Sequence, residues 1–535
     1  MKSRLIVLLI GWSLLSFGQT EDAFVYFNAK PNASYYLENP HEMLSERALQ
    51  RRLNQNIALD ITDTPIHTPY VTEVGNLISV LAQSKWLNAV YVRGDYQAIL
   101  DLNELTFVER IEFVNKNLNP LGRKATPIRK PSGAQKSLDA QSFPYGGSAH
   151  QIQMHNGDLL HQEGYTGSGK IIAVIDTGFE GVNFTDSFQR LFDNNLILGG
   201  YNFILRNNNI YTGGNHGTRV LSVIGGYKEN ELVGTAPDAE FYLFVTENPN
   251  SESPLEEALW VEAAEMADSL GVDIINTSLG YDTFDNPNYN HSYEDLDGQT
   301  TFISRGLNIA FSKGMLCVTS AGNSGNSDWL YVATPGDAHG SLTVGAVNSE
   351  GEYAWFSSIG PTADQRIKPD VTGQGVATVT ATQYGTITTG NGTSFSTPII
   401  SGLAACLWSA YPELTSAQLF QIIKESAHLY QNPNNYLGYG IPDFYQAFQN
   451  AALRIKNLDK RQVVLYPNPA TNFISFQGNS SEKVNLKIFD ISGKLILDQR
   501  LTTNQKIDVS NINSGIYLYS LTTENSIQTG KFVKK

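Results

Sequence analysis

The stretch Lys170-Ile171-Ile172-Ala173-Val174-Ile175, followed by Asp176-Thr177-Gly178, decides the fold. Successive side chains of a strand point to opposite faces, so a run that is apolar throughout has both faces covered. From Gly164 to about Leu453, short runs of this kind alternate with helical stretches such as Leu255 to Leu270. This alternation predicts an α/β domain with a parallel sheet and helices on both faces. Asp176 would then lie at the carboxyl end of a strand, where ligand sites in open α/β sheets gather.

A histidine and a serine stand at the starts of two other apolar stretches. His216-Gly217-Thr218 opens the helix-like run Val220 to Ile224. Gly392-Thr393-Ser394-Phe395-Ser396-Thr397-Pro398 precedes the run Ile399 to Trp408. Ser394 therefore begins a helix, whose dipole and free N–H groups favour negative charge developing beside it.

Each of the three polar residues also has a purely structural interpretation, with Asp176 as a strand-end cap, His216 as a helix-start residue and Ser394 as an N-cap. Together they favour chemistry. A serine hydroxyl becomes a good nucleophile when a histidine takes its proton, and a buried carboxylate holds that histidine in one tautomer. Asp-Thr-Gly is also typical of aspartic proteases, but those need two carboxylates that share a proton. The sequence has one such tripeptide and no Asp-Ser-Gly, which argues against that class.

Residues about 145 to 450 resemble the catalytic domain of subtilisin-like serine proteases, in which the triad follows the same chain order of Asp, His and Ser. Two further blocks match in the expected order. Asn276-Thr277-Ser278-Leu279-Gly280 resembles the strand that lines the substrate cleft, and Ser320-Ala321-Gly322-Asn323-Ser324-Gly325 resembles the segment that supplies the oxyanion-hole asparagine. The resemblance implies a serine endopeptidase that acts on proteins or peptides and needs no cofactor for catalysis. It implies the catalytic residues Asp176, His216, Ser394 and Asn323, and the substrate-binding residues Ser278, Leu279, Gly280, Ala321 and Gly322.

The two additional blocks also have a physical logic of their own. Attack on a peptide carbonyl puts negative charge on its oxygen, and the Asn323 amide with the backbone N–H of Ser394 would hold it. Ser278-Leu279-Gly280 would bind extended substrate backbone as an added strand. The structural alternatives are a turn residue between glycines for Asn323 and an ordinary strand end for Ser278 to Gly280.

Two features of the catalytic region are candidates for metal binding. The insertion-like loop Tyr281 to Thr300 has no Lys or Arg and five acidic residues, namely Asp282, Asp285, Glu294, Asp295 and Asp297. It would rim the cleft, bind the structural calcium that relatives often use, or be a solvated loop, which we favour because no EF-hand-like pattern is present. His155 and His161 lie close in sequence, but without a third ligand or a His-Glu-x-x-His motif we interpret them as structural. The metal ligands therefore stay unknown.

The chain begins with features of an exported precursor. Lys2 and Arg4 precede a short apolar run that ends near Gly18, which predicts a signal peptide over residues 1–18. Residues 19–142 then combine an expected helix, Glu42 to Leu53, with β-like runs at Ala23 to Asn28 and Phe107 to Val114. The Pro- and Gly-punctuated stretch Asn119 to Gly147 reads as an exposed linker.

This α+β region resembles the proregions of secreted subtilisin-like proteases from the Bacteroidota. The resemblance rests on Ser45-Glu46-Arg47-Ala48 and on Ser84-Lys85-Trp86-Leu87-Asn88-Ala89-Val90. It implies that the region acts as an inhibitor and folding aid for the peptidase domain, residues 143–453.

The last region, residues 461–535, changes character. Short alternating strands such as Asn485 to Phe489 and Ile516 to Leu521 are separated by turn signals, which predicts a small all-β sandwich. The segments Tyr466-Pro467-Asn468-Pro469-Ala470, Phe489-Asp490-Ile491-Ser492-Gly493-Lys494 and Ser514-Gly515-Ile516-Tyr517 resemble the C-terminal sorting domain of the type IX secretion system. The resemblance implies secretion or attachment to the cell surface by that machinery. The alternative is a carbohydrate- or protein-binding appendage.

Composition narrows the functional classes. The 535 residues contain 37 Lys plus Arg against 52 Asp plus Glu, a formal charge of −15, which argues against nucleic acid as a partner. Cys317 and Cys406 lie in apolar runs and are expected to be buried free thiols. Two hypotheses remain: an active endopeptidase made as a zymogen, or a non-catalytic binding module on a protease fold. The presence of Asp176, His216, Ser394 and Asn323 together favours the enzyme, because a binding module needs none of them.

Overall fold

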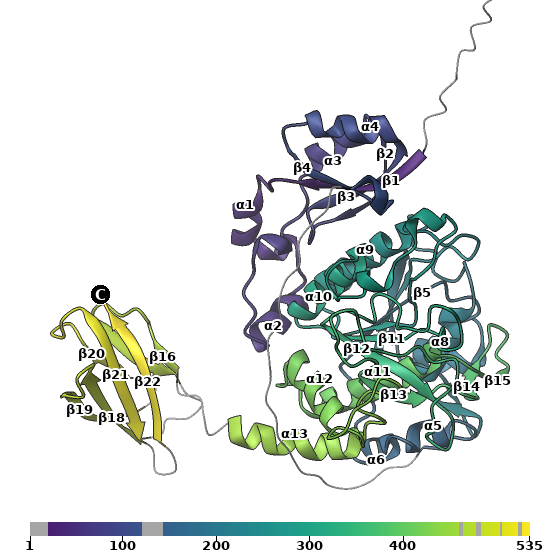
Figure 1. Cartoon of the computed structure of the whole chain (residues 1–535). Coiled ribbons are helices and arrows are strands. Elements are labelled where there is room, and N and C mark those ends of the chain that lie inside the picture. Colours follow the sequence, from purple (N-terminus) through teal and green to yellow (C-terminus); the bar gives the residue numbers. More distant parts are fainter. Residues whose placement is uncertain (1–19, 120–142, 459–463, 478–482, 503–504, 523–526) are drawn as a thin grey trace, which may run out of the picture. The chain divides into compact units, whose positions relative to one another are not determined.

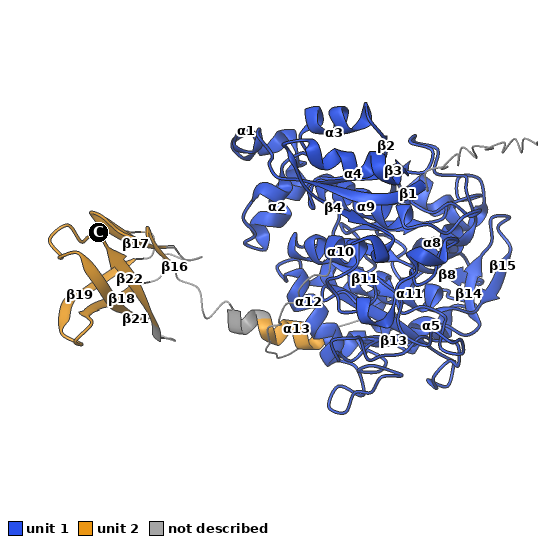
Figure 2. Cartoon of the chain, turned by 45° about the horizontal axis from the view of Figure 1, so that its top comes forward, with its two compact units in different colours: residues 1–132, 137–448 blue, residues 133–136, 449–535 orange. Residues whose placement is uncertain are grey.

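The computed structural model describes residues 20–119, 143–458, 464–477, 483–502, 505–522 and 527–535 (Figure 1). The predicted signal peptide and most of the predicted linker lie outside the described residues. The described residues up to Phe448 form one compact unit, and those from Gln449 onward belong to a second unit (Figure 2).

A seven-stranded parallel sheet forms the centre of the first unit. Its strands are, in spatial order, β13 (Val371–Gln374), β12 (Ser341–Val347), β11 (Leu316–Ser320), β10 (Ile274–Thr277), β5 (Ile171–Asp176), β9 (Glu240–Val245) and β6 (Ile197–Asn202). All six residues of β5 are buried. The predicted α/β class, with a parallel sheet whose strands are covered on both faces, is confirmed.

Two pairs of helices cover the sheet. Helices α9 (Leu255–Leu270) and α10 (Phe302–Ser312) pack on one face, where Ile171, Ala173 and Ile175 of β5 join their core. Helices α8 (His216–Gly225) and α11 (Thr393–Ala410) pack together against the sheet on the other side. Because side chains alternate along β5, Asp176 faces α8 and α11.

Shorter elements complete the catalytic region. They are α5 (Ala149–Gln153), α6 (Gly157–Gln162), α7 (Gln189–Asp193), α12 (Ser416–Glu425), α13 (Phe444–Leu458) and the two-stranded pairs β7 (Tyr227–Lys228) with β8 (Leu232–Val233) and β14 (Thr378–Ala381) with β15 (Ile387–Gly390). Cys317 and Cys406 are buried free thiols, as predicted. Within the described residues, none of the helices combines the length and apolar character that a bilayer span requires.

The N-terminal region (residues 20–119) is an α+β element docked on α9 and α10. Its antiparallel sheet has the order β2 (Ser79–Ser84), β3 (Ala89–Asp95), β1 (Thr20–Phe27) and β4 (Val108–Phe113), with α3 (Thr68–Gly75) and α4 (Tyr96–Asp101) packed on it. Ala23, Val25 and Phe27 of β1 point into the region's own core. Phe24 and Tyr26 point into the core that α9 and α10 share, where the Phe24 ring stacks on Phe302 at 3.9 Å.

The helix predicted over Glu42 to Leu53 is divided in the structure. A 3-10 turn, η1 (Pro40–Glu42), precedes α2 (Glu46–Asn54). The break falls at Ser45, whose extended backbone and side-chain oxygen, which accepts a hydrogen bond from the Ala48 N–H, make it the N-cap of α2. Local capping therefore overrides the continuous helical pattern.

The second unit contains the predicted β-sandwich. One sheet has β16 (Val464–Tyr466), β17 (Phe473–Gln477) and β20 (Lys506–Asp508), and the other has β19 (Leu495–Thr502), β18 (Lys483–Asp490), β21 (Gly515–Thr522) and β22 (Ile527–Lys534). Ile474 and Phe476 from the first sheet share a core with Leu486, Ile488 and Leu521 from the second. The all-β prediction is confirmed.

The docking of the N-terminal sheet generates a stability prediction. We expect Phe24→Ala to lower the free energy of unfolding of the full-length chain by about 3–5 kcal/mol, because a buried aromatic ring is lost and a cavity is left against Phe302. Leu53→Ala, at a side chain that is 73% exposed, should change it by less than about 0.5 kcal/mol. Urea denaturation measures both. Similar values for the two variants would contradict the packing role of Phe24.

Candidate active site

The structure places Asp176 and His216 in contact at the carboxyl end of β5. The Oδ1 atom of Asp176 lies 2.7 Å from Nδ1 of His216 and also accepts a hydrogen bond from the Thr177 N–H. Asp176 is fully buried, whereas His216, the first residue of α8, is half-buried. A carboxylate acceptor at Nδ1 keeps the proton on that atom, which leaves Nε2 of the neutral ring free to accept a proton.

Gly217 allows α8 to begin this close to β5. A Cβ atom at position 217 would lie 2.6 Å from the carbonyl oxygen of Gly178 and 2.9 Å from Cβ of Asp176. A larger residue would therefore push the start of the helix away from the strand and separate His216 from its carboxylate.

The surroundings of His216 have opposing effects on its pKa. Burial of the ring favours the neutral form, whereas the charge of Asp176 and the hydrogen bond to its carboxylate favour the imidazolium. The charge of Arg219, three residues further along α8, again favours the neutral form. The effect of Asp176 prevails, so the pKa of His216 is raised above its usual value.

Ser394 is the second residue of α11, and its helix start is tied to the end of β10. The Ser394 hydroxyl donates a hydrogen bond to the carbonyl oxygen of Ser278 at 3.1 Å, and the Ser278 hydroxyl donates to the carbonyl oxygen of Ser394 at 3.0 Å. The adjacent Phe395 ring lies 5.9 Å from the ring of His216. Gly392 occupies the N-cap position, so Ser394 is not the N-cap that its structural interpretation suggested.

The Asn323 side chain is oriented by the same helix start. Its Oδ1 accepts hydrogen bonds from the N–H of Thr393 at 2.9 Å and from the Thr393 hydroxyl at 3.1 Å, so its NH₂ group points elsewhere. A Cβ atom built on Gly392 would lie 3.6 Å from Nδ2 of Asn323 and 3.7 Å from the backbone nitrogen of Ser394. Two N–H donors therefore flank the space that the absent side chain of Gly392 leaves.

The five residues expected to bind substrate fall into two groups. Leu279 and Gly322 are half-buried, Gly280 is exposed, and Ser278 is buried but bonded to Ser394. Ala321, by contrast, is fully buried, and its N–H and carbonyl groups are bonded to Val344 and Ala333. The structure thus gives Ala321 a packing position behind the other four, which corrects its inclusion among residues that contact substrate.

The loop Tyr281 to Thr300 is packed, which corrects the preference for a solvated loop. Tyr281, Tyr289 and Leu296 are buried, and Asp295 accepts a hydrogen bond from Lys116 of the N-terminal region at 2.5 Å. The sequence pattern suggested solvent because the carboxylates of the loop have no basic partner within it. The partner comes from a segment more than a hundred residues earlier in the chain.

Histidines and carboxylates elsewhere fit structural roles. His155 and His161 are buried and bonded to the carbonyl oxygens of Pro442 and Thr235, and burial lowers the pKa of each to about 4. Their interpretation as structural residues is confirmed. Across the described part of the chain, one group of three carboxylates, Glu247, Glu252 and Glu256, has the spacing for a cation. Glu247 and Glu256 already accept hydrogen bonds from Tyr281 and from backbone N–H groups, so the group has partners without a metal.

Sequence reasoning missed the role of Thr393. Its hydroxyl also accepts a hydrogen bond from the Gly322 N–H at 3.2 Å, so one side chain links the Asn323 segment to the helix that carries Ser394. Its position directly before Ser394 in the same motif was the available signal. Arg219 was missed as well, although spacing by three residues on a helix brings it to the side of His216.

Comparison with protein families identifies the central region. Residues 167–440 match the family model described as "Subtilase family". The chain belongs to the subtilase family. Residues 22–131 of this subtilase match the "Peptidase S8 propeptide domain, Bacteroidota", and residues 464–535 match the "Secretion system C-terminal sorting domain".

Individual relatives agree with that assignment. Subtilisin NAT of Bacillus subtilis subsp. natto is 31% identical over 353 residues, which cover 64% of this chain and 82% of that protein. Subtilisin of Bacillus pumilus is 31% identical over 314 residues, covering 58% of this chain and all of that protein. Among solved structures, MycP1 with its N-terminal propeptide removed is similar over 56% of this chain and 96% of its own, with 24% identity and a TM-score of 0.45.

Membership defines the general activity and destination of this protein. It is a subtilisin-like serine endopeptidase, and subtilases need no cofactor for catalysis. Its propeptide domain, called the proregion below, identifies it as a zymogen. Its sorting domain identifies it as a substrate of type IX secretion, exported to the cell surface or the extracellular space.

The environment of His216 generates a prediction about its pKa. We expect Asp176→Asn to lower the pKa of His216 below the usual histidine value, because burial and Arg219 then act without the opposing carboxylate. NMR of the chain with ¹³C-labelled histidine measures the shift, and His216→Gln assigns the signal. Asp193→Asn, at an exposed position, is the control and should leave it unchanged. An unchanged pKa in Asp176→Asn would contradict the electrostatic role of Asp176.

Proposed function

We propose that this subtilase hydrolyses peptide bonds through an acyl-enzyme intermediate, with Ser394 as nucleophile, His216 as general base and Asp176 as the carboxylate that holds the imidazole. The observation that carries the proposal is the 2.7 Å contact between Asp176 and His216, beside a helix whose second residue is Ser394. The two residues are 40 positions apart, and the contact leaves Nε2 as the proton acceptor.

The proposed reaction begins when the Ser394 hydroxyl turns from the Ser278 carbonyl to Nε2 of His216. His216 takes the proton as the serine oxygen attacks the scissile carbonyl carbon, and the imidazolium is stabilised by Asp176. His216 then gives the proton to the leaving amine, which departs and leaves the acyl group on Ser394. A water molecule, deprotonated by His216, hydrolyses the ester and restores the serine.

The proposed oxyanion hole consists of the Asn323 amide and the backbone N–H of Ser394. Their arrangement around the space at Gly392 supports this role, because charge develops on the carbonyl oxygen only during attack. Ser278, Leu279, Gly280 and Gly322 would bind the substrate backbone, with Gly280 allowing a close approach. A calcium ion would support structure only, and we assign no ligands to it.

The proposed domain boundaries follow the sequence: a signal peptide over residues 1–18, a proregion and linker over residues 19–142, the peptidase over residues 143–453 and the sorting domain over residues 461–535. The proregion would inhibit its own peptidase until the linker is cut. Support comes from the packing of β1 against Phe302 and of the cleft-side loop against Lys116.

The competing possibility is a binding module on a protease fold. Labelling by a serine-directed fluorophosphonate separates the two, because the reagent needs an activated serine and not merely a cleft.

Ser394→Ala tests the nucleophile. We expect peptide hydrolysis by the mature variant to fall to the background that binding and the oxyanion hole sustain, roughly 10³ to 10⁴ above the rate in water. The melting temperature should stay within about 2 °C, because the lost hydroxyl makes one hydrogen bond at a half-buried position. Activity within tenfold of the unaltered enzyme would refute the assignment.

Asn323→Leu tests the oxyanion donor. We expect kcat to fall by roughly 10² to 10³, about 2.7 to 4 kcal/mol, with KM almost unchanged; the magnitude is taken from the subtilisin asparagine. Thr393→Val is the matched control, because it removes the hydroxyl that bonds to Asn323 but keeps the amide donor, and it should cost less than tenfold in kcat. If Asn323 only shapes a turn, its replacement would instead raise KM and lower the melting temperature.

A further inference from the structure

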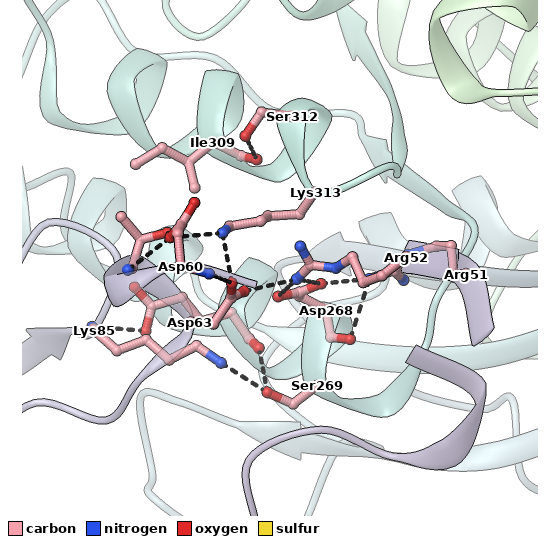
Figure 3. Close-up of polar contacts among 12 residues, drawn as sticks. Arg51, Arg52, Asp60, Asp63, Lys85, Asp268, Ser269, Ile309, Ser312 and Lys313 are labelled. Atoms are coloured by element: carbon pink, nitrogen blue, oxygen red, sulfur yellow. Dashed lines mark hydrogen bonds and ion pairs between the residues drawn. The ribbon is translucent and has the colours of Figure 1, made fainter. Parts of the chain in front are cut away.

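The proregion has an arm that leaves its antiparallel sheet between β1 and α3. The arm spans residues 28–67 and contains α1 (Ala33–Glu38), η1, α2 and η2 (Ile61–Asp63). Helix α2 and η2 contact the catalytic domain through a group of charged side chains, shown in Figure 3. The buried Lys30 ammonium joins the arm to the proregion sheet, because it donates hydrogen bonds to the carbonyl oxygens of Thr64 and Lys85.

The arm binds at the end of the central sheet opposite to the triad. Its partners in the catalytic domain are Gly169, residues 268–273, Lys313, Gly314 and Ser416. Most of these precede the first residues of β5, β10 and β11, whereas Asp176, Ser278 and Asn323 lie at or beyond the last residues of the same strands. With a rise of about 3.3 Å per residue, strands of this length separate the two ends by roughly 15–20 Å.

Arg51 and Arg52 bind the same buried carboxylate from the catalytic domain. Both guanidinium groups donate to Asp268, and that of Arg52 also bonds to Asp63 at 2.9 Å. Lys313 of the catalytic domain reaches Asp63 from the other side at 2.9 Å. Asp268 is fully buried, and Arg51 and Arg52 are 5% and 2% exposed. Among the described residues, both ion pairs of Asp268 are with proregion arginines.

The charges are balanced only when the arm is in place. The proregion contributes Arg47, Arg51 and Arg52 with Asp60 and Asp63, and the catalytic domain contributes Asp268 and Asp273 with Lys313. Buried charges are tolerated when they are paired, and removing one partner leaves the other uncompensated. The arm therefore supplies the positive charge that the two aspartates require.

The carboxyl end of α9 also favours cations from outside the domain. A helix end carries a partial negative charge, and α9 has no basic residue in its last turn. Gly271 ends the helix with φ +87°, and a Cβ atom there would lie 2.8 Å from the Arg47 side chain and 2.9 Å from the Ala48 nitrogen. The missing side chain gives α2 access to the carbonyl oxygens, so that Arg47 bonds to that of Gly271 and Arg51 to that of Val272.

We propose that Asp268, Asp273 and the carbonyl groups of Gly271 and Val272 form an arginine-binding surface whose partner is the proregion arm, and that this surface holds the proregion on the catalytic domain independently of the active site. Cutting the linker then leaves the proregion bound at both ends of the domain. Release requires that the arm detach as well. The proposal goes beyond the catalytic assignment, because it concerns a surface that takes no part in peptide hydrolysis.

The test measures how fast a cut proregion dissociates. The full-length chain with Ser394→Ala receives a recognition site for an unrelated, specific protease at residues 133–136. After cleavage, the chain is immobilised through its C-terminus and loss of the proregion is followed by surface plasmon resonance. We expect Arg51→Met/Arg52→Met to dissociate at least about 100-fold faster than the chain with an unaltered arm. The measurement needs no peptidase activity, so its outcome is independent of the triad assignment.

Arg93→Met is the matched control, because that arginine pairs with Asp22 inside the proregion. It should dissociate within about threefold of the reference. A rate for Arg51→Met/Arg52→Met within threefold of the reference would overturn the proposal. If the double variant fails to fold, Arg47→Gln replaces it, since Arg47 is partly exposed but bonds to Asp273 and to the carbonyl oxygens of Gly271 and Gly169. An increase of about tenfold is then expected, and an unchanged rate would overturn the proposal.

Discussion

Burial of β5 on both faces is the constraint on which the rest of the structure depends. A strand that is apolar on both sides must lie between two layers of helices, and its carboxyl end must then emerge where the layers open. Asp176 is the first polar side chain of that strand, and alternation along the strand turns it toward α8. The contact with His216 follows from this placement, since Gly217 lets the helix begin against the strand.

Helix α9 has two roles that its sequence combines on different faces. One face belongs to the core under the central sheet, where Trp260 is fully buried. The other bears Glu262, Glu265 and Asp268, at a spacing of three residues, and each accepts hydrogen bonds from the proregion. Glu265 binds the turn between β2 and β3, and Asp268 binds α2. A row of carboxylates on a helix that would otherwise be solvated thus becomes the docking surface for the precursor.

The precursor therefore has polar groups in the peptidase that are satisfied by residues outside it. Asp268 and the loop residue Asp295 are paired with Arg52 and Lys116 of the proregion. Such pairs are specific, because a carboxylate deprived of its cation in a buried site is unfavourable. The same pairs explain why neither carboxylate could be assigned a partner from its own neighbourhood in the sequence.

The sequence by itself determined the α/β class, the α+β and all-β flanking regions, the family and the residues of the proposed triad. These features depend on local patterns: continuous apolar runs, helical periodicity and short motifs in a set order. The tertiary structure decided the position of Ala321 behind the cleft, the packing of the loop Tyr281 to Thr300, the linkage of Asn323 to Thr393 and the arginine contacts of Asp268. Each of these depends on a partner distant in the chain, and the pairing of distant charges and hydrogen-bonding groups is set by how whole elements pack, a property that no local pattern encodes.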